Sequence, residues 1–515
     1  MARKASGFET AETHVSQLFF TPTRVYKVKK PVHFGFVDFS TAEARWRACR
    51  DEVRLNRRLA PDVYTGVACF RTPDGVEEPV VAMLRMPDER RLSTLVAADD
   101  PSVRDRLAEV AATVAGFHVR AERSADIDAD ALPGAVRRLW TDNLRELAPF
   151  LGSALARERG AEVERLALRY LETAGHVFAS RVAAGHACDG HGDLMADDIF
   201  CLADYPRILD CLEFDPRLRH GDVVADVAFL AMDLERLGRP DLADHFLGCY
   251  QSASGDTWPL SFTHHWIAYR ALVRAKVACL RGDRDDAARL LEMTVRHLRR
   301  AEVRLVLVGG TPGTGKSTLA RALGRTLHWP VLHSDVLRKE LAGLDPLTHA
   351  EAPFGAGLYA ADRTAAVYAE LVALAGDRLD AGQSVIIDAS WLRQCWREAA
   401  AATAEAVGAE LIALRCETPD KVAFDRLEAR RHSEVGDPSD ATAEVAAMLA
   451  LFADPWPEAV RLDTSGSPEE TLAAALIAVG GVLDEPDAPT APDAPAEASV
   501  DIRVWTLRSV HPAAR

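Results

Sequence analysis

Residues 304–317 read RLVLVGGTPGTGKS, and this stretch decides the fold of the C-terminal part of the chain. Its first six residues are strand-like and, after Arg304, apolar, and the helix-forming segment STLARALGRTL (317–327) follows the glycine-rich loop. The residues from Gly310 to Ser317 fit the pattern G-x-x-x-x-G-K-[ST] in full. Glycines let backbone N–H groups curl around a phosphate, and the positive end of the helix adds to the attraction. The sequence therefore predicts a phosphate-binding loop.

The residue types in this loop have separate chemical roles. Lys316 is expected to reach the β- and γ-phosphates of a nucleotide, and Ser317 is expected to bind Mg²⁺. ATP and Mg²⁺ are therefore the expected cofactors. A glycine-rich turn with a fortuitous Lys-Ser pair is the alternative, and the flanking strand and helix argue against it. The predicted nucleotide contacts are Gly310, Thr311, Pro312, Gly313, Thr314, Gly315, Lys316, Ser317 and Thr318.

The region around the loop alternates apolar strands with amphipathic segments of helical length. Its five strand-like runs are RLVLVGG, PVLHSD, SVIIDAS, ELIALRCE and AVRLDTS. Such alternation predicts βαβ units and a five-stranded parallel sheet, which gives an α/β domain over 301–483. The boundary before this domain is placed near residue 300, in the charged stretch LRRAEV.

Two carboxylates stand at the ends of these strands. Asp335 closes VLHSD, and Asp388 closes SVIID. Because ligands of open α/β sheets lie outside the carboxyl ends of the strands, both are expected beside the γ-phosphate. Asp388 is expected to hold Mg²⁺, directly or through water, and Asp335 to orient or deprotonate an acceptor hydroxyl. Helix capping after a strand is the alternative for each.

A third element of the predicted site is the arginine-rich segment FDRLEARR (424–431). Arg426 and Arg430 are four residues apart and share a helix face. Arginines that close over ATP neutralise the charge that develops on the transferred phosphoryl group. A solvated arginine face is the alternative. Arg338 and Arg397 are further candidates on the substrate side.

These motifs resemble one group of P-loop kinases, which includes polynucleotide 5′-kinases, gluconate-type kinases and zeta toxins. The resemblance rests on the phosphate loop, HSDVLRKEL (333–341), SVIIDAS (384–390) and the arginine-rich segment. It implies that Asp335 serves the acceptor hydroxyl as a catalytic residue. P-loop ATPase motors, AAA proteins included, usually carry a Glu after the strand-end Asp to activate water, and Ala389 stands there. This departure favours transfer to a hydroxyl over hydrolysis.

The N-terminal part carries a second set of motifs, HGDLMADDIF (191–200) and RILD (207–210). They resemble the catalytic and metal loops of aminoglycoside phosphotransferases. The resemblance implies that Asp193 is the catalytic base and that Asp198 and Asp210 bind Mg²⁺, as phosphoryl transfer requires. The chain departs from the family at two places. Asp198 replaces an Asn, and Thr21-Pro-Thr replaces a glycine-rich phosphate loop.

The segment before these motifs is predicted to form a small α+β unit. Lys27 on a strand and Glu52 on the following helix match the lysine–glutamate pair of a kinase N-lobe, and Lys29 is a second candidate because it shares the strand face. We therefore expect a protein-kinase-like, aminoglycoside-phosphotransferase-like domain over 1–300, either as an active kinase site or as a ligand-sensing module. Its predicted elements are a hairpin (14–20 and 25–30), a helix (41–60), two strands (63–70 and 79–86), an N-lobe over about 10–86 and a C-lobe over about 87–300.

Composition limits the classes of protein further. The 515 residues are 48% hydrophobic and 27% charged, which is typical of a folded chain and excludes disordered or fibrous classes. With 77 acidic and 61 basic residues the net charge is -16, so nucleic acid is not expected as a partner. Scattered cysteines and the absence of a signal sequence predict a cytoplasmic protein that does not associate with membranes. Residues 484–499 read as a Pro/Ala/acidic linker, and 500–515 as a strand-like tail.

Together the two resemblances cover nearly residues 10–480. They match bacterial fusion proteins described as bifunctional aminoglycoside phosphotransferase-like and AAA-labelled ATP-binding proteins. The leading prediction is an Mg²⁺- and ATP-dependent phosphotransferase that moves the γ-phosphate to a hydroxyl of a small molecule through the C-terminal domain. One alternative is an ATP-dependent regulatory protein in which neither site transfers phosphate. Another is a 5′-hydroxyl nucleic-acid kinase.

Overall fold

The computed structural model describes residues 3–480, apart from 6–7, 14, 35–36, 72–74, 76, 349–355, 432–438 and 440. The predicted linker and tail, at 484–499 and 500–515, lie outside the described residues. By its internal contacts the described chain divides into two compact units, one of residues up to 139 with 178–257, the other of 140–177 with 258 onward. This division groups residues by their internal contacts and does not test the predicted domain boundary near residue 300, which stays a prediction. None of the described helices combines the length and apolar character needed to cross a bilayer.

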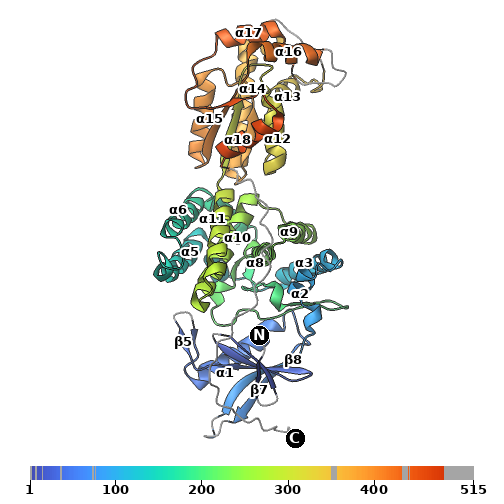
Figure 1. Ribbon diagram of the computed structural model, residues 1–515, viewed down its shortest axis with the longest axis vertical. Coiled ribbons are helices and arrows are strands. Elements are labelled where there is room, and N and C mark those ends of the chain that lie inside the picture. The colour runs from blue at the N-terminus through green and yellow to red at the C-terminus, as the bar shows by residue number, and fades with distance from the viewer. Residues whose placement is uncertain are drawn as a thin grey trace. The chain divides into compact units, whose positions relative to one another are not determined.

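The first unit opens with a six-stranded antiparallel sheet in the order β1-β2-β3-β4-β8-β7 (Figure 1). Its hairpin β3–β4 is the predicted one, and the Thr21 hydroxyl closes the turn by accepting the Arg24 N–H at 2.9 Å. Strands β1 and β2 extend the sheet beyond the prediction. The strand bounds are β1 Arg3–Ala5, β2 Phe8–Glu12, β3 Ser16–Phe20, β4 Arg24–Lys29, β5 His33–Phe34, β6 Val37–Asp38, β7 Tyr64–Arg71 and β8 Glu77–Leu84, with β5 and β6 forming a separate hairpin.

Helix α1 (Ala42–Asn56) packs against this sheet and begins at Thr41, whose side chain accepts the Ala44 N–H. Val53 of the helix lies in one apolar cluster with Val25 of β4 and Val81 of β8. Burial of these side chains fixes the distance between helix and sheet. Glu52 therefore lies at 0% exposure between α1 and β4.

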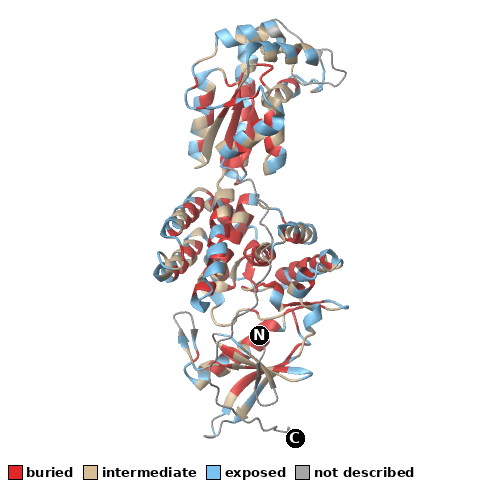
Figure 2. Ribbon diagram, viewed as in Figure 1, coloured by how far each residue is buried: buried red, intermediate tan, exposed pale blue. Residues whose placement is uncertain are grey.

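The rest of the first unit is helical, with short strand pairs between the helices. Helix α8 is buried along almost its whole length, as Figure 2 shows by colour. The pairs β9–β12 and β10–β11 hold the loops that carry the predicted site residues. The bounds are α2 Leu92–Ala97, α3 Val103–Arg120, α4 Ala125–Ala131, α7 Gly175–Ala183, β9 Ala187–Asp189, β10 Ile199–Cys201, β11 Pro206–Ile208, β12 His220–Asp222, α8 Val223–Arg236 and α9 Pro240–Ser254.

The second unit contains a parallel sheet with its flanking helices and, before the sheet in the chain, a helical part. The helices of this part are α5 (Pro133–Leu147), whose first residues belong to the other unit, α6 (Arg157–Thr173), α10 (Leu260–Arg281) and α11 (Arg284–Ala301). Helices α10 and α11 pack on each other, and Gly282 ends α10 in the left-handed region at φ 79°. Helix α11 leads directly into the first strand of the sheet.

The sheet of the second unit has five parallel strands in the order β14-β15-β13-β16-β17 (Figure 1). This confirms the predicted α/β P-loop fold. One apolar core joins the sheet to α14 and α15, and another joins it to α12 and α18, so the central strands are buried on both faces (Figure 2). The bounds are β13 Arg304–Gly309, α12 Lys316–Leu327, β14 Val331–His333, α13 Ser334–Leu341, α14 Ala361–Asp380, β15 Val385–Asp388, α15 Gln394–Ala406, β16 Glu410–Glu417, α16 Asp420–Arg431, α17 Ala443–Leu451, β17 Val460–Asp463 and α18 Pro468–Ala478.

Candidate functional sites

The predicted phosphate loop joins β13 to α12, and its glycines are required by its conformation. Gly310, Gly313 and Gly315 all have positive φ, at 136°, 85° and 85°. A Cβ added to Gly313 would lie 2.6 Å from the carbonyl oxygen of Ala423 in α16. The Lys316 ammonium donates to the Thr311 carbonyl across the loop at 3.2 Å. The loop is therefore compact, and its backbone has the conformation that only glycine adopts without strain.

The remaining predicted loop residues differ in exposure. Ser317 and Lys316 are partly buried in the first turn of α12, while Thr318 is exposed. The Thr314 carbonyl accepts a hydrogen bond from the Thr464 hydroxyl at 2.7 Å, which ties the loop to the segment after β17. Sequence reasoning missed Thr464, which is the next-to-last residue of the strand-like run AVRLDTS and stands two residues before a glycine.

Asp388 ends β15 at the carboxyl edge of the sheet, as predicted. It is paired in register with His333 of β14, whose Nδ1–H donates to its carboxylate at 2.9 Å. Burial by itself raises the pKa of Asp388, but the His333 hydrogen bond, the Lys316 charge and the Ser317 hydrogen bond outweigh burial and lower the pKa. Asp388 therefore stays a carboxylate beside the loop. His333 is a site residue that sequence reasoning missed.

Asp335 lies in the first turn of α13. The prediction that it closes a strand is wrong, because β14 ends two residues earlier, at His333. Burial raises its pKa, against opposing contributions from a Ser439 hydrogen bond and from the charges of Arg338 and Lys316. The structure therefore brings Asp335, Asp388 and Lys316 within electrostatic reach of one another. A carboxyl group with a raised pKa beside a phosphate loop fits the general-base role predicted from the sequence.

The predicted arginines fall into different environments. Arg426 donates to the Thr464 carbonyl at 2.7 Å, so it lies beside the phosphate loop. Arg430 is part of α16, and its side chain lies outside the described residues. The prediction that Arg397 lies on the substrate side is wrong. Its guanidinium donates to the carbonyls of Trp391 and Pro455, at 2.8 and 2.6 Å, which makes it a buried structural residue rather than a substrate contact.

Arg338 is buried beside Asp335, at 7% exposure. One of its terminal nitrogens donates to the Leu358 carbonyl and the Thr364 hydroxyl, at 3.0 and 3.1 Å. Its guanidinium also stacks over the Tyr359 ring at 4.7 Å. Within the part of the chain that the structure describes, no carboxylate forms an ion pair with Arg338. It is a buried cation next to the candidate base.

In the first unit, the predicted lysine–glutamate pair is formed, and Lys29 takes part in it. Glu52 binds Lys27 through Oε1 at 2.9 Å and Lys29 through Oε2 at 2.6 Å. Lys27 also contacts the Asp210 carboxylate, and Lys29 contacts Glu213. Burial by itself lowers the pKa of both lysines, but the carboxylates raise them above their ordinary value, so both lysines are charged at neutral pH.

Glu213 completes this cluster and was missed by sequence reasoning. Its side chain is 7% exposed and lies three residues after Asp210. Burial raises the pKa of Glu213 against the opposing charge of Lys29. Burial also acts to raise the pKa of Glu52, but the charges of Lys27 and Lys29 outweigh it and lower that pKa. Glu213 is therefore the first of these two carboxylates to take up a proton as the pH falls.

The HGD loop follows β9 and is held by Asp226 of α8, another residue that sequence reasoning missed. Asp226 accepts the backbone N–H groups of His191 at 2.5 Å and Gly192 at 2.8 Å. Its carboxylate also contacts His118 Nε2 at 3.2 Å. Burial favours the neutral acid, but the hydrogen bonds and the charges of His118 and His191 lower the pKa of Asp226. A buried carboxylate therefore fixes the backbone on which Asp193 is carried.

Asp198 and Asp210 lie on the two sides of the β10–β11 hairpin. Burial and the charges of Asp210 and Asp193 raise the pKa of Asp198 well above its ordinary value. Asp210 has a left-handed backbone at φ 61°, a conformation that costs a non-glycine residue energy, and its side chain is 46% exposed. Burial favours its neutral form, but Lys27 lowers the pKa of Asp210. The repulsion among these aspartates is the situation that a bound cation relieves.

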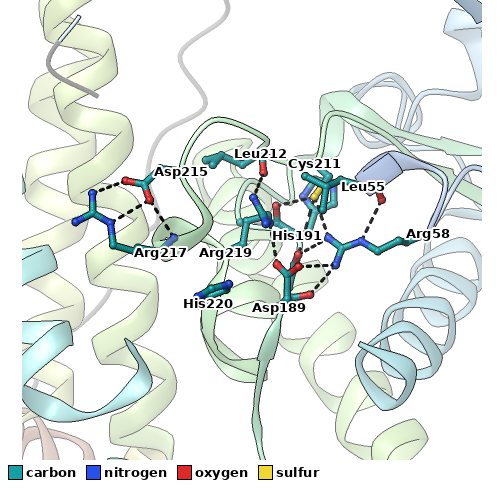
Figure 3. Close-up of polar contacts among 12 residues, drawn as sticks. Leu55, Arg58, Asp189, His191, Cys211, Leu212, Asp215, Arg217, Arg219 and His220 are labelled. Carbon is teal, nitrogen blue, oxygen red and sulfur yellow. Dashed lines mark hydrogen bonds and ion pairs between the residues drawn. The ribbon is translucent and has the colours of Figure 1, made fainter. Parts of the chain in front are cut away.

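A network of ion pairs and hydrogen bonds joins α1 to the loops of this site (Figure 3). Arg58, just beyond the end of α1, donates to the carbonyls of Asp189 and Gly190 at 2.9 and 2.8 Å and to the Cys211 sulfur at 3.2 Å (Figure 3). Arg219 donates to the Asp189 carboxylate at 2.8 Å. This network fixes the strand before the HGD loop and the residue after Asp210 relative to the helix that carries Glu52.

Both sites offer the oxygen donors that Mg²⁺ prefers, which are carboxylates and a hydroxyl. In the described residues, no three His, Cys, Asp or Glu side chains converge as a ready-made metal cage. Burial and repulsion together raise the pKa of Asp198, and Ser317 lies beside Asp388. Both observations nevertheless fit a cation that arrives with a nucleotide. The predicted ligands, Asp198 and Asp210 in one site and Ser317 and Asp388 in the other, stay predictions.

Fold and sites define a chain that joins an aminoglycoside-phosphotransferase-like, protein-kinase-like N-terminal part to a C-terminal P-loop domain. A family model described as an AAA domain matches residues 305–455. The protein Rv2004c of Mycobacterium tuberculosis (strain H37Rv) is 42% identical over 475 residues, which cover 90% of this chain and 94% of the relative. The protein Mb2027c of Mycobacterium bovis has the same identity and coverage. The chain belongs to the family of these mycobacterial proteins.

Solved structures are similar to each part separately. A sugar kinase from Janibacter sp. is 20% identical, covers 35% of this chain and 95% of its own, and has a TM-score of 0.27. The GDP complex of aminoglycoside 2′-phosphotransferase-IIIa is 13% identical, covers 56% of this chain and 90% of its own, and has a TM-score of 0.34.

Proposed function

We propose that the protein is an Mg²⁺- and ATP-dependent phosphotransferase that moves the γ-phosphate of ATP to a hydroxyl of a small molecule through its C-terminal P-loop domain. The observation that carries this proposal is the grouping of Lys316, Ser317, Asp388 and Asp335 at one edge of the parallel sheet. A phosphate cradle, an Mg²⁺ carboxylate and a separate carboxyl group with a raised pKa are the parts that phosphoryl transfer to a hydroxyl needs.

In this reaction the loop residues bind and orient the triphosphate. Backbone N–H groups between Gly313 and Thr318 would face the phosphates, since Pro312 has no N–H and Gly310 donates its own to the Ser390 carbonyl, and Lys316 would place its charge on the β- and γ-phosphates. Ser317 and Asp388 would hold Mg²⁺, and the bound ion would neutralise charge on the phosphate oxygens. His333 keeps Asp388 ionised and oriented through its 2.9 Å hydrogen bond. Arg426, beside the loop at Thr464, and Arg430 of the same helix would complete the positive surroundings of the transferred group.

The acceptor lies on the side of Asp335 in this proposal. Asp335 accepts the proton of the acceptor hydroxyl, and its raised pKa improves it as a base. Arg338 adds a buried cation beside it. Because no carboxylate among the described residues pairs with this buried guanidinium, an acceptor that carries a phosphate, carboxylate or sulfate group besides its hydroxyl fits this site best. Ala389 offers no base for a water molecule, which supports transfer over hydrolysis.

The experiment that tests this function is a screen of hydroxyl acceptors with the full-length protein, Mg²⁺ and ATP. Matched pairs of neutral and anionic acceptors, such as sugars with sugar acids and nucleosides with nucleotides, test the acceptor class directly. The account expects acceptor-dependent formation of ADP and a phosphorylated product. The proposal would be contradicted if ADP and inorganic phosphate formed at the same rate in the absence of an acceptor as in the presence of each acceptor tested.

The N-terminal site is proposed as a second, kinase-like Mg²⁺–ATP site, either active or ligand-sensing. The formed Lys27–Glu52 pair and the anchored HGD loop support this proposal. Asp193 would be the base, and Asp198 and Asp210 would hold Mg²⁺. The tight turn at Thr21 and the replacement of Asn by Asp198 favour the sensing role as an alternative. Calorimetric titration of the full-length Lys316→Ala variant with Mg²⁺–ATP tests nucleotide binding at this site, because the P-loop contribution is removed.

A 5′-hydroxyl nucleic-acid kinase is the weaker alternative for the C-terminal site. The net charge of -16 opposes the approach of a polyanion. Binding of labelled RNA or DNA with a steep dependence on salt would favour this alternative. The proposal of a small-molecule acceptor expects no such binding.

A further inference from the structure

The buried pair Lys29–Glu213 has no role in the reaction proposed above. One lysine paired with one glutamate is enough to orient a nucleotide phosphate. Here Lys29 is 2% exposed and the Glu213 side chain 7% exposed, so both charges are held away from water. Burying two further charges costs free energy that only close pairing recovers. A second buried ion pair next to Glu52 is therefore expected to have a role of its own.

The geometry places the two lysines on opposite sides of one carboxylate. Lys27 and Lys29 are two residues apart on β4 and point to the same face of the sheet. Glu52 binds one lysine with each oxygen, at 2.9 and 2.6 Å. Beyond the lysines stand Asp210 on one side and Glu213 on the other. The five side chains form one row, Asp210–Lys27–Glu52–Lys29–Glu213, in which positive and negative charges alternate.

The two ends of this row face different surroundings. The Asp210 side chain is 46% exposed and is a proposed Mg²⁺ ligand, so the arrival of Mg²⁺–ATP would take it from Lys27. Lys27 would then move to the phosphates. At the other end, Lys29 and Glu213 are buried, and among the described residues neither is paired with a solvent-exposed charge. Lys27 is the movable member of the row, and Lys29 is the fixed one.

We propose that Lys29 and Glu213 are positioning residues that hold Glu52 in place while Lys27 changes its partner from Asp210 to the nucleotide phosphates. Lys29 stays paired with one carboxylate oxygen of Glu52 throughout. Glu52 therefore orients Lys27 through its other oxygen without fully neutralising the charge of Lys27. Glu213 holds Lys29 and prevents it from drawing Glu52 away from Lys27. This inference rests on the proposed N-terminal nucleotide site.

The direction in which one substitution changes the affinity for Mg²⁺–ATP distinguishes this positioning role from a simple electrostatic effect. Glu213→Gln removes a negative charge near the phosphates. If Glu213 had no positioning role, this substitution would leave the affinity for Mg²⁺–ATP unchanged or raise it. Under the proposal the affinity falls by about tenfold or more, because Lys29 draws Glu52 toward itself and Lys27 stays on Asp210. The isosteric amide keeps the volume of the side chain, so the fold is preserved.

A double variant tests whether the pair is only structural. Lys29→Met with Glu213→Gln removes one charge of each sign and leaves the net charge of the row unchanged. A structural ion pair can be replaced in this way with little effect, so the double variant would then bind Mg²⁺–ATP like the parent. The proposal expects weak binding instead, because Glu52 loses the partner of its second oxygen and competes with the phosphates for Lys27.

The experiment is calorimetric titration of full-length protein with Mg²⁺–ATP, with Lys316→Ala as the common parent that lacks the P-loop contribution. Glu78→Gln is the matched control, because Glu78 pairs with Arg45 of α1 at 2.8 Å and does not touch the row. The expected result is weaker binding in Glu213→Gln and in the double variant, with the control unchanged. Parent-like affinity in either variant overturns the positioning role and leaves the nucleotide site standing. Absence of binding in the parent itself overturns both the proposed site and this inference. Should the double variant not fold, Glu213→Gln decides alone.

Discussion

The contact between Gly313 and α16 makes a quantitative prediction about the phosphate loop. Gly313→Ala places a Cβ at a residue with φ 85°, which costs roughly 1–2 kcal/mol for any residue other than glycine. The same Cβ would lie 2.6 Å from the Ala423 carbonyl oxygen and 3.1 Å from Leu427 Cγ, so loop and helix must separate by several tenths of an ångström. Overpacking of this kind costs about 1–3 kcal/mol more. Because the displaced backbone is the phosphate cradle, we expect ATP affinity to fall roughly 10- to 100-fold.

The matched control is Gly282→Ala. Gly282 has nearly the same φ, 79°, but no atom lies within 4 Å of its added Cβ. It therefore carries the backbone strain alone and is expected to lower stability by roughly 1–2 kcal/mol without changing ATP affinity. Thermal unfolding gives the stability of both variants, and titration with Mg²⁺–ATP gives the affinity. Equal ATP affinity in the two variants would refute the argument that α16 fixes the loop.

Three further predictions concern the charged residues. Lys316→Ala should reduce nucleotide binding at the C-terminal site severely, which a fluorescent ATP analogue measures, and unchanged binding there would overturn the loop assignment. Asp335→Asn should keep ATP affinity and lower transfer roughly 100-fold, the range for a positioned base; in the unchanged protein transfer should rise with pH across a range above that of an ordinary aspartate, since burial raises the pKa of Asp335. A parallel loss of ATP affinity would identify Asp335 as a structural or metal residue. Mg²⁺–ATP binding at the N-terminal site should release a proton, because Asp198 has a raised pKa and must ionise to bind metal; calorimetry in buffers of different ionisation enthalpy should show less release in Asp198→Asn, and equal release would exclude Asp198 as the source.

The parts of the fold that follow local sequence patterns were predictable. The conformation of the loop Gly310–Ser317 and of the five apolar strands depends mainly on their own residues. The parallel sheet is formed by these strands. Strands β1 and β2 were not predicted, because FETAE (8–12) lacks the strong apolar alternation of a half-buried strand and pairs with β3 only through its backbone register. Asp335 was placed on a strand because the strand-to-helix change falls within three residues, where periodicity has no resolution.

The residues missed at the sites share one property, which is that their partners are far away in the sequence. Asp226 lies in an apolar helix and meets the HGD loop 34–35 residues earlier, and Arg58 meets Cys211 at a separation of 153 residues. Glu213 meets Lys29 across 184 residues. Sequence patterns place such residues on elements but do not show which buried charges meet. Arg397 illustrates the reverse error, since an arginine near a site motif was given a substrate role although backbone carbonyls bind it.

The most direct test of the central claim is to follow the γ-phosphate of ATP by ³¹P NMR in the presence of the acceptor found by screening. The account predicts a new phosphate-ester signal that grows as ATP is consumed, is absent in Lys316→Ala, and grows roughly 100-fold more slowly in Asp335→Asn. A signal of inorganic phosphate alone, or a phosphate ester formed equally well by Lys316→Ala, would contradict the claim that the C-terminal P-loop domain transfers phosphate to a hydroxyl.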